Sequence, residues 1–155
     1  MNLYILRHGE AEPRAASDSL RQLTTHGIEE ARQVARQFAA KGVILDRCFV
    51  SPYVRAVQTA GEFLRELHSD VAQEQQSLLR PSVRASEVMR FLQGQDARHI
   101  LLVSHNPLVS ELCALLVEGS VNDLHILHTA ELVCVSLDQI GLGMGASPYR
   151  LVPGG

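Results

Sequence analysis

The sequence predicts an α/β fold, a three-layer sandwich with a mostly parallel central sheet and one antiparallel edge strand. Short apolar runs alternate along the chain with segments of helical periodicity, which is typical of strand–helix–strand units. The chain has 155 residues and contains no internal repeat, linker or low-complexity segment. We therefore expect residues 1–155 to form a single domain, long enough to bury a proper core.

The first predicted strand covers residues 2–7, which are almost entirely apolar. The polar stretch 10–21 is expected to form a loop. The next helix can be capped by Thr24 or Thr25, and Gly42 is expected to end it. Its apolar positions recur at helical spacing, at Ile28, Ala31, Val34, Ala35 and Phe38.

A second strand is expected over residues 46–50, and it leads into Ser51-Pro52, a pair that suits the N-cap and first position of a helix. Arg55 lies in the first turn of that helix, off its predicted buried stripe. This stripe consists of Val57, Ala60, Leu64 and Leu67. Residues 69–82 are polar and predict a loop with a short strand, and a helix is expected near 84–94.

A clear apolar run predicts a third long strand over residues 99–104. Asn106-Pro107 opens the next predicted helix. The apolar face of this helix contains Leu108, Leu112, Leu115 and Leu116. Strands are expected over 132–137 and near 148–152. The glycines of 141–145 lack dinucleotide-binding spacing and precede no helix, so they indicate a turn between these strands.

The composition excludes several classes of protein. A formal net charge of −3 argues against a general nucleic-acid binder. No apolar run approaches the roughly 20 residues that span a bilayer, and the N-terminal run is too short for a signal peptide, so we expect a cytoplasmic protein without a membrane segment. Cys48, Cys113 and Cys134 are isolated in apolar contexts and are expected to be reduced core residues.

Lys41 is the only lysine among the 14 basic residues. The planar guanidinium of the other basic residues matches phosphate oxygens better than an ammonium does. High-GC codon usage is the alternative explanation for most of these arginines. It does not explain why an arginine stands directly beside His8.

Polar residues follow three predicted strands at the same edge of the sheet. They are Arg7-His8-Gly9, Ser51 to Arg55, and Ser104 to Pro107. Open α/β sheets bind ligands at the carboxyl ends of their strands, and helix N-termini there favour anions. Gly9 would let the backbone approach a ligand closely. The pattern therefore predicts a phosphoryl site, with phosphoryl transfer through a histidine.

These motifs resemble those of the histidine phosphatase superfamily, which has the phosphoglycerate-mutase-like fold. The matching segments are Leu6-Arg7-His8-Gly9-Glu10, Leu23-Thr24-Thr25-His26-Gly27, the segment from Val50 to Ala60, and Val103-Ser104-His105. The resemblance covers nearly the whole chain. Its short length and residues 15–24 are most similar to the bacterial protein phosphohistidine phosphatases, which remove phosphate from a histidine-containing phosphotransfer domain.

The resemblance implies that His8 is the nucleophile and that Arg7, Arg55 and His105 bind the transferring phosphoryl group. Gly9 belongs to the same predicted substrate site. Neighbouring cations should lower the pKa of His8 and keep it neutral near pH 7. Arg21 either flanks this pocket or is a solvated loop arginine. No cofactor is expected.

Larger relatives carry a carboxylic acid between the second arginine motif and the second histidine. Here the corresponding stretch, residues 76–82, has no carboxylate. An alkoxide leaving group needs an acid partner, whereas an imidazole protonates readily near neutral pH. The missing acid therefore favours phosphohistidine as the substrate, although Glu10, Glu74 and Glu87 remain possible substitutes.

The sequence thus predicts an enzyme that dephosphorylates a histidine-phosphorylated protein, a phosphotransfer domain or phosphorelay component, at an open, shallow site. We expect a monomer. The alternatives are a small-molecule phosphomonoesterase or mutase of the same fold, and a non-catalytic phosphoprotein-binding module. His125 and His128 have the spacing of a helical metal pair, but no further ligand completes a site, so no metal is expected. Ser51 and Ser104 are interpreted as helix caps.

Overall fold

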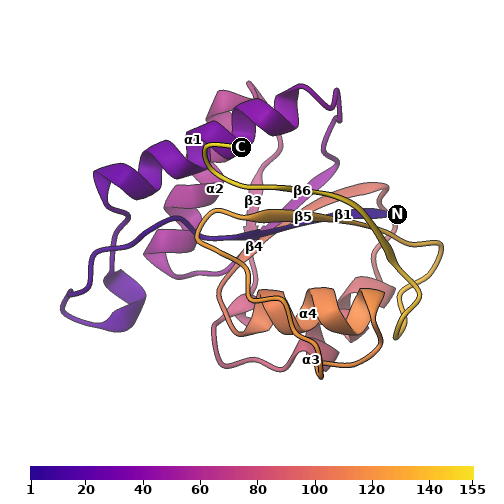
Figure 1. Ribbon diagram of the computed structural model, residues 1–155. Coiled ribbons are helices and arrows are strands. Elements are labelled where there is room, and N and C mark those ends of the chain that lie inside the picture. Colours follow the sequence, from indigo (N-terminus) through magenta and orange to yellow (C-terminus); the bar gives the residue numbers. More distant parts are fainter.

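The computed structural model describes residues 1–155 and contains one six-stranded sheet with helices on both faces (Figure 1). The strands are β1 (Asn2–Arg7), β2 (Arg47–Val50), β3 (Gln73–Gln75), β4 (His99–Ser104), β5 (Leu132–Ser136) and β6 (Ala146–Leu151). The helices are α1 (Thr25–Ala39), α2 (Val54–Glu66), α3 (Ala85–Gln93) and α4 (Leu108–Val117), with short 3-10 helices η1 (Asp18–Leu20) and η2 (Ser77–Leu79).

The strand order in the sheet is β3-β2-β4-β1-β5-β6. The first four strands in that order are parallel, whereas β5 is antiparallel to both of its neighbours, β1 and β6. The predicted α/β fold, with a mostly parallel sheet and antiparallel pairing toward one edge, is therefore confirmed. None of the helices combines the length and apolarity required to cross a membrane.

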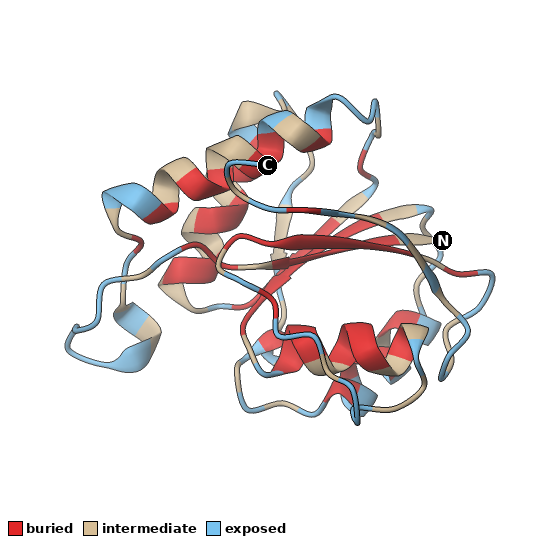
Figure 2. Ribbon diagram, viewed as in Figure 1, coloured by how far each residue is buried: buried red, intermediate tan, exposed pale blue.

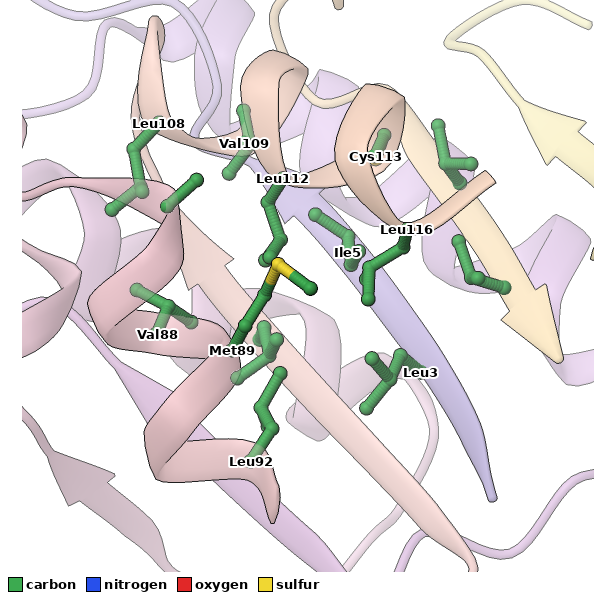
Figure 3. Close-up of a cluster of buried hydrophobic side chains, with 14 of the residues drawn as sticks. Leu3, Ile5, Val88, Met89, Leu92, Leu108, Val109, Leu112, Cys113 and Leu116 are labelled. Carbon is green, nitrogen blue, oxygen red and sulfur yellow. The ribbon is translucent and has the colours of Figure 1, made fainter. Parts of the chain in front are cut away.

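The sheet separates two apolar cores (Figures 1 and 2). Alternate residues of β1 point to opposite faces, so Leu3 and Ile5 enter one core while Tyr4 and Leu6 enter the other. Helices α3 and α4 cover the first core with leucine, valine and methionine side chains (Figure 3). Helices α1 and α2 cover the second. Burial on both faces explains why β1 and β4 are continuous apolar runs.

Two local predictions about the second helix need correction. Helix α2 begins at Val54, with Tyr53 rather than Ser51 as its N-cap residue. Arg55 does not lie outside the buried surface: it is only 5% exposed. Both differences have one cause, because the chain between β2 and α2 folds inward at the carboxyl edge of the sheet and brings polar groups into the interior.

Candidate active site

The register of the sheet brings the three predicted strand ends to the same level. Leu6 of β1 pairs with Val103 of β4, and Val103 pairs with Val50 of β2. The residues that follow these strands therefore start side by side at the carboxyl edge of the sheet. His8 and His105 meet there, with their ring centroids 5.1 Å apart.

His8 is held with a proton on one ring nitrogen and a lone pair on the other. Its Nδ1 lies 2.6 Å from the Gly9 carbonyl oxygen, which can only accept, so Nδ1 carries the proton. Its Nε2 accepts a hydrogen bond from Arg55 Nε at 3.3 Å. Burial, with a further contribution from Arg55 and Arg7, lowers the pKa of His8 from 6.5 to about 4. His8 is therefore a neutral imidazole at pH 7, with a lone pair on Nε2.

His105 is only 1% exposed and is anchored by Ser51. Its Nε2 lies 2.7 Å from Ser51 Oγ, and that oxygen also accepts a hydrogen bond from the Tyr53 amide. Burial and the neighbouring His8 lower the pKa of His105 to about 3. Its Nδ1 is buried without a partner. An unpaired buried polar atom is costly and marks a position that a ligand can satisfy.

Two arginines complete the inner part of the site. Arg7 donates from Nη1 to the Leu127 carbonyl at 2.9 Å, while its Nε is buried without a partner. Arg55 comes from the first turn of α2 and reaches His8. His8, Ser51, Arg55 and His105 form the buried part of the site, which we call the pocket floor. The unpaired Arg7 Nε and His105 Nδ1, together with the guanidinium groups of Arg7 and Arg55, suit a tetrahedral oxyanion.

Gly9 serves packing in this structure. Its amide donates to Thr59 Oγ1 at 3.1 Å, so it is not free for a ligand. A Cβ atom on Gly9 would lie 2.5 Å from the Gly27 carbonyl oxygen, and one on Gly27 would lie 2.0 Å from the Glu10 carbonyl oxygen. The sequence predicted a glycine here so that the backbone could approach a ligand. In the structure, the glycine is needed because position 9 lies in close contact with the start of α1.

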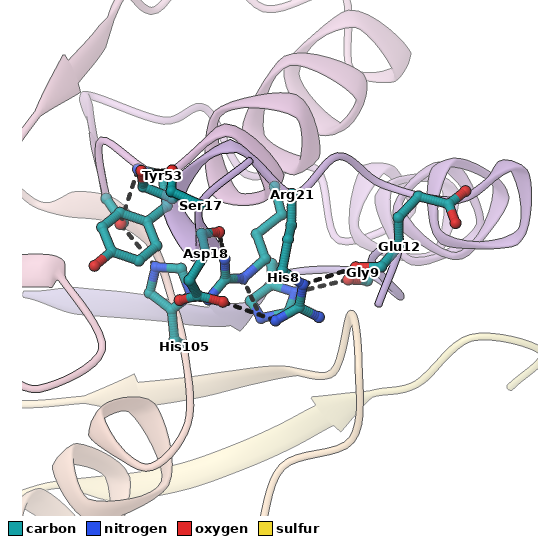
Figure 4. Close-up of polar contacts among 11 residues, drawn as sticks. His8, Gly9, Glu12, Ser17, Asp18, Arg21, Tyr53 and His105 are labelled. Carbon is teal, nitrogen blue, oxygen red and sulfur yellow. Dashed lines mark hydrogen bonds and ion pairs between the residues drawn. The ribbon is translucent and has the colours of Figure 1, made fainter. Parts of the chain in front are cut away.

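The polar loop after β1 lies over the floor (Figure 4). Asp18 in η1 binds Arg55 twice, through its carbonyl oxygen at 2.7 Å from Nη1 and its carboxylate at 3.2 Å from Nη2. Arg21 donates to the other Asp18 carboxylate oxygen at 2.9 Å and to the Glu12 carbonyl at 2.7 Å. We call Asp18 and Arg21 the pocket rim.

The rim makes the site less open than the sequence predicted. His8 is 8% exposed and Arg55 5%, whereas the Asp18 side chain above them is 57% exposed. Asp18 therefore lies between the buried guanidinium of Arg55 and solvent. Arg21 does flank the pocket, although its direct contacts are with Asp18 and its own loop.

A buried carboxylate, Glu131, fixes the segment whose Leu127 carbonyl binds Arg7. Glu131 is 1% exposed and accepts hydrogen bonds from His125 Nε2 and the His128 amide. These histidines lie outside any helix, so the helical metal-pair geometry considered for them does not occur.

Three roles were missed or misassigned at the sequence level. Ser51 and Ser104 do not cap helices: Ser51 binds His105, and Ser104 Oγ donates to the Leu79 carbonyl at 2.6 Å. Asp18 had no signal beyond being one acidic residue in a polar loop.

The carboxylates considered as substitute acids are engaged elsewhere. Glu74 pairs with Arg47, Glu87 caps α3, and Glu10 contacts Thr24.

The family model of the histidine phosphatase superfamily (branch 1) matches residues 3–80. Phosphohistidine phosphatase SixA of Escherichia coli K12 is 36% identical over 146 residues, covering 92% of this chain and 89% of the relative. A phosphohistidine phosphatase SixA homolog of Haemophilus influenzae is 38% identical over 124 residues, covering 74% of this chain and 76% of the relative.

A solved structure gives the same result in three dimensions. The protein histidine phosphatase SixA complexed with tungstate superimposes with a TM-score of 0.90 at 34% sequence identity. The match covers 99% of this chain and 97% of that one. Tungstate is a tetrahedral oxyanion, as is phosphate.

Proposed function

The chain belongs to the histidine phosphatase superfamily, and we propose that it dephosphorylates a histidine-phosphorylated protein through a transient phosphohistidine on His8. The observation that carries this proposal is the state of His8. Its Nδ1 proton is fixed on the Gly9 carbonyl, and its Nε2 lone pair faces Arg55. A neutral imidazole with a fixed tautomer is an activated nucleophile, since no proton has to be removed before it attacks.

In the proposed first step, His8 Nε2 attacks phosphorus while the bond between phosphorus and the substrate nitrogen breaks. Arg7, Arg55 and His105 would bind the three equatorial oxygens of the transferring group. Arg7 Nε and His105 Nδ1 are the buried atoms that still lack a partner. Charge spreads over these oxygens in a loose transition state, so preorganised donors stabilise it more than they stabilise the substrate.

In the proposed second step, water attacks the phosphoryl group on His8. The phosphorus–nitrogen bond returns its electron pair to Nε2, and inorganic phosphate leaves with the protons of the water shared between phosphate and solvent. His8 is thereby restored as the neutral tautomer. The hydrogen bond from Nδ1 to Gly9 persists through both steps, because Nε2 alone exchanges its partner.

The acid–base groups favour phosphohistidine over a phosphomonoester. The stretch 76–82 contributes no carboxylate, and Glu10, Glu74 and Glu87 are bound to Thr24, Arg47 and the start of α3. An alkoxide leaves poorly without a proton donor, whereas an imidazole leaves as a neutral base. A phosphomonoesterase of the same fold remains the second candidate function.

The relatives named phosphohistidine phosphatases support a histidine-phosphorylated protein as the partner in general. We further propose a phosphotransfer domain or phosphorelay component as that partner, with residues 1–155 acting as one monomeric domain. The cytoplasm is the proposed compartment, which agrees with three buried cysteines that form no disulfide.

The test compares a histidine-phosphorylated phosphotransfer domain with a panel of phosphomonoesters, using wild-type protein, His8→Ala and His128→Ala. His128 is exposed and lies outside the floor, so its variant is the matched control. We expect rapid phosphate loss from the phosphohistidine protein alone, which His8→Ala abolishes and His128→Ala retains. An acid-labile phosphoryl group should be trapped on wild type and on His128→Ala but not on His8→Ala. Preferential turnover of monoesters would instead support the second candidate function, that of a phosphomonoesterase.

A further inference from the structure

The Asp18 carboxylate occupies an unexpected position for a phosphate-binding site. It lies 3.2 Å from Arg55 Nη2 and 2.9 Å from Arg21 Nη1. Arg55 is the guanidinium that also contacts the His8 nitrogen proposed to attack phosphorus. In the view of Figure 4, Asp18 projects between Arg21 and His105, at the entrance to the floor. A substrate phosphoryl group would therefore be bound close to a fixed negative charge.

A carboxylate in this position weakens binding of an oxyanion. Like charges a few ångströms apart repel, and the carboxylate also competes for the hydrogen bonds of Arg55. The two carboxylate oxygens accept separately from Arg21 and Arg55, whereas an amide of the same shape would accept through one oxygen only. A positive charge on the part of the substrate outside the phosphoryl group would be attracted by this carboxylate and would offset the repulsion.

Phosphohistidine carries such a charge when the free nitrogen of its imidazole ring is protonated. An imidazole has an ordinary pKa of about 6.5, so this form is accessible near neutral pH. Resting on the proposed function, we infer that Asp18 is a specificity-determining residue that binds the protonated imidazole ring of phosphohistidine before its bond to phosphorus breaks. A phosphomonoester leaving group offers no cation and would gain nothing from Asp18.

The step balances without a proton donor from the enzyme. The bond between phosphorus and one ring nitrogen breaks, and its electron pair stays on that nitrogen. The other ring nitrogen keeps its proton, so the ring departs as neutral imidazole. The His8 Nε2 lone pair forms the new bond to phosphorus. Asp18 would stabilise the cationic ring before the bond breaks and would remain a carboxylate throughout.

The surroundings of Asp18 keep it ionised, which this role requires. The Arg21 hydrogen bond, supported by Arg55, holds the pKa of Asp18 below its usual value. The charged and titratable groups that face it are Arg21 on its own loop, Arg55 from α2, and His105 beyond β4. An ionised Asp18 cannot donate a proton to a leaving alkoxide, so the same geometry disfavours monoesters.

The experiment compares Asp18→Asn with Glu12→Gln, a variant that removes a carboxylate from the same loop. Only the backbone of Glu12 contacts Arg21. Substrates are a histidine-phosphorylated phosphotransfer domain, phosphoimidazole and p-nitrophenyl phosphate, with inhibition by tungstate measured in parallel. For Asp18→Asn we expect kcat/KM to fall about tenfold or more on both phosphoimidazole substrates, as expected for loss of one charge partner. Activity on p-nitrophenyl phosphate should be unchanged or higher, and tungstate should inhibit more strongly.

Two results would overturn the inference. One is an equal loss on all three substrates with weaker tungstate inhibition, since Asp18 would then act only by orienting Arg55. The other is unchanged activity of Asp18→Asn on phosphoimidazole. A wild-type protein inactive on both phosphoimidazole substrates gives a different pattern and would overturn the proposed function itself. Glu12→Gln should match wild type in every assay.

Discussion

The floor and the rim of the pocket differ in what controls their charge. On the floor, burial keeps His8 and His105 neutral, because removal from water disfavours the imidazolium form. On the rim, Asp18 is largely exposed and its charge depends on ion pairs with arginines. The neutral state of the floor histidines therefore does not depend on ion pairs or on solvent, which suits the reacting groups. The rim carries a charge that faces solvent, which suits discrimination between substrates.

The largest expected effect is the loss of a guanidinium from the floor. Arg55→Ala should lower kcat/KM for a phosphohistidine protein by about 10³-fold, the size expected for an arginine that stabilises a transferring phosphoryl group. Arg65→Ala on the same helix is the control, because Arg65 is exposed and pairs with Glu62. A loss of less than tenfold for Arg55→Ala, with its fold intact, would show that Arg55 does not bind the phosphoryl group.

The buried histidines also predict a pH dependence of stability. The folded protein binds a proton on His8 only near pH 4, whereas the unfolded chain binds it near pH 6.5. This contribution to stability is therefore present above pH 6.5 and is lost as the pH falls toward 4. The loss is on the order of 3 kcal/mol for His8, and His105 adds to it in the same direction.

Urea denaturation between pH 8 and pH 4 measures this effect. His8→Gln should flatten the decline in the free energy of unfolding, because no imidazole then resists protonation at that position. The exposed His128 serves as the control, and His128→Gln should leave the decline as in wild type. Parallel curves for His8→Gln and wild type would contradict the assignment of a neutral, desolvated His8.

A smaller effect is expected where the backbone supports the floor. In Gly27→Ala the new Cβ would lie 2.0 Å from the Glu10 carbonyl oxygen, so the start of α1 must shift away from the loop after β1. We expect a loss of about 2 kcal/mol in the free energy of unfolding, as for other overpacked sites. Chemical denaturation measures it.

Gly61→Ala in α2 is the matched control, since its Cβ would meet only the end of the Gln73 side chain, at 3.5 Å. This variant should gain roughly 0.5–1 kcal/mol from the better helix propensity of alanine. Equal destabilisation by both substitutions would show that the contact between Gly27 and Glu10 is not special.

The parts of the fold and site that could be predicted from sequence are those encoded locally. The apolar runs that end at Arg7 and Ser104 predicted two central parallel strands, and strand ends in one sheet converge at the same edge. That rule, together with the resembling motifs, was enough to bring His8 and His105 together. The histidines meet because each directly follows one of two paired strands, in which Arg7 is in register with Ser104.

The rim could not be predicted in the same way. Asp18 lies in a polar loop with no periodicity, and its position is set by hydrogen bonds to Arg55, which is 37 residues away in the sequence. Ser51 and Ser104 were assigned as caps because serine near a helix start usually caps it. In the structure both serines are buried at the sheet edge, and their hydroxyl groups bind interior partners instead of helix ends. These partners are His105 for Ser51 and the Leu79 carbonyl for Ser104.

A modest effect is expected for these two serines, which separate support of the reaction from support of the fold. Ser51→Ala removes the 2.7 Å contact with His105 Nε2 and leaves that buried nitrogen unpaired, so kcat/KM should fall about tenfold. Ser104→Ala removes an equally buried hydrogen bond, to the Leu79 carbonyl, that touches neither histidine. It should lower the free energy of unfolding by about 1–3 kcal/mol and leave kcat/KM unchanged. If both variants lost activity in proportion to stability, Ser51 would be a structural residue, and the orientation of His105 would come from packing alone.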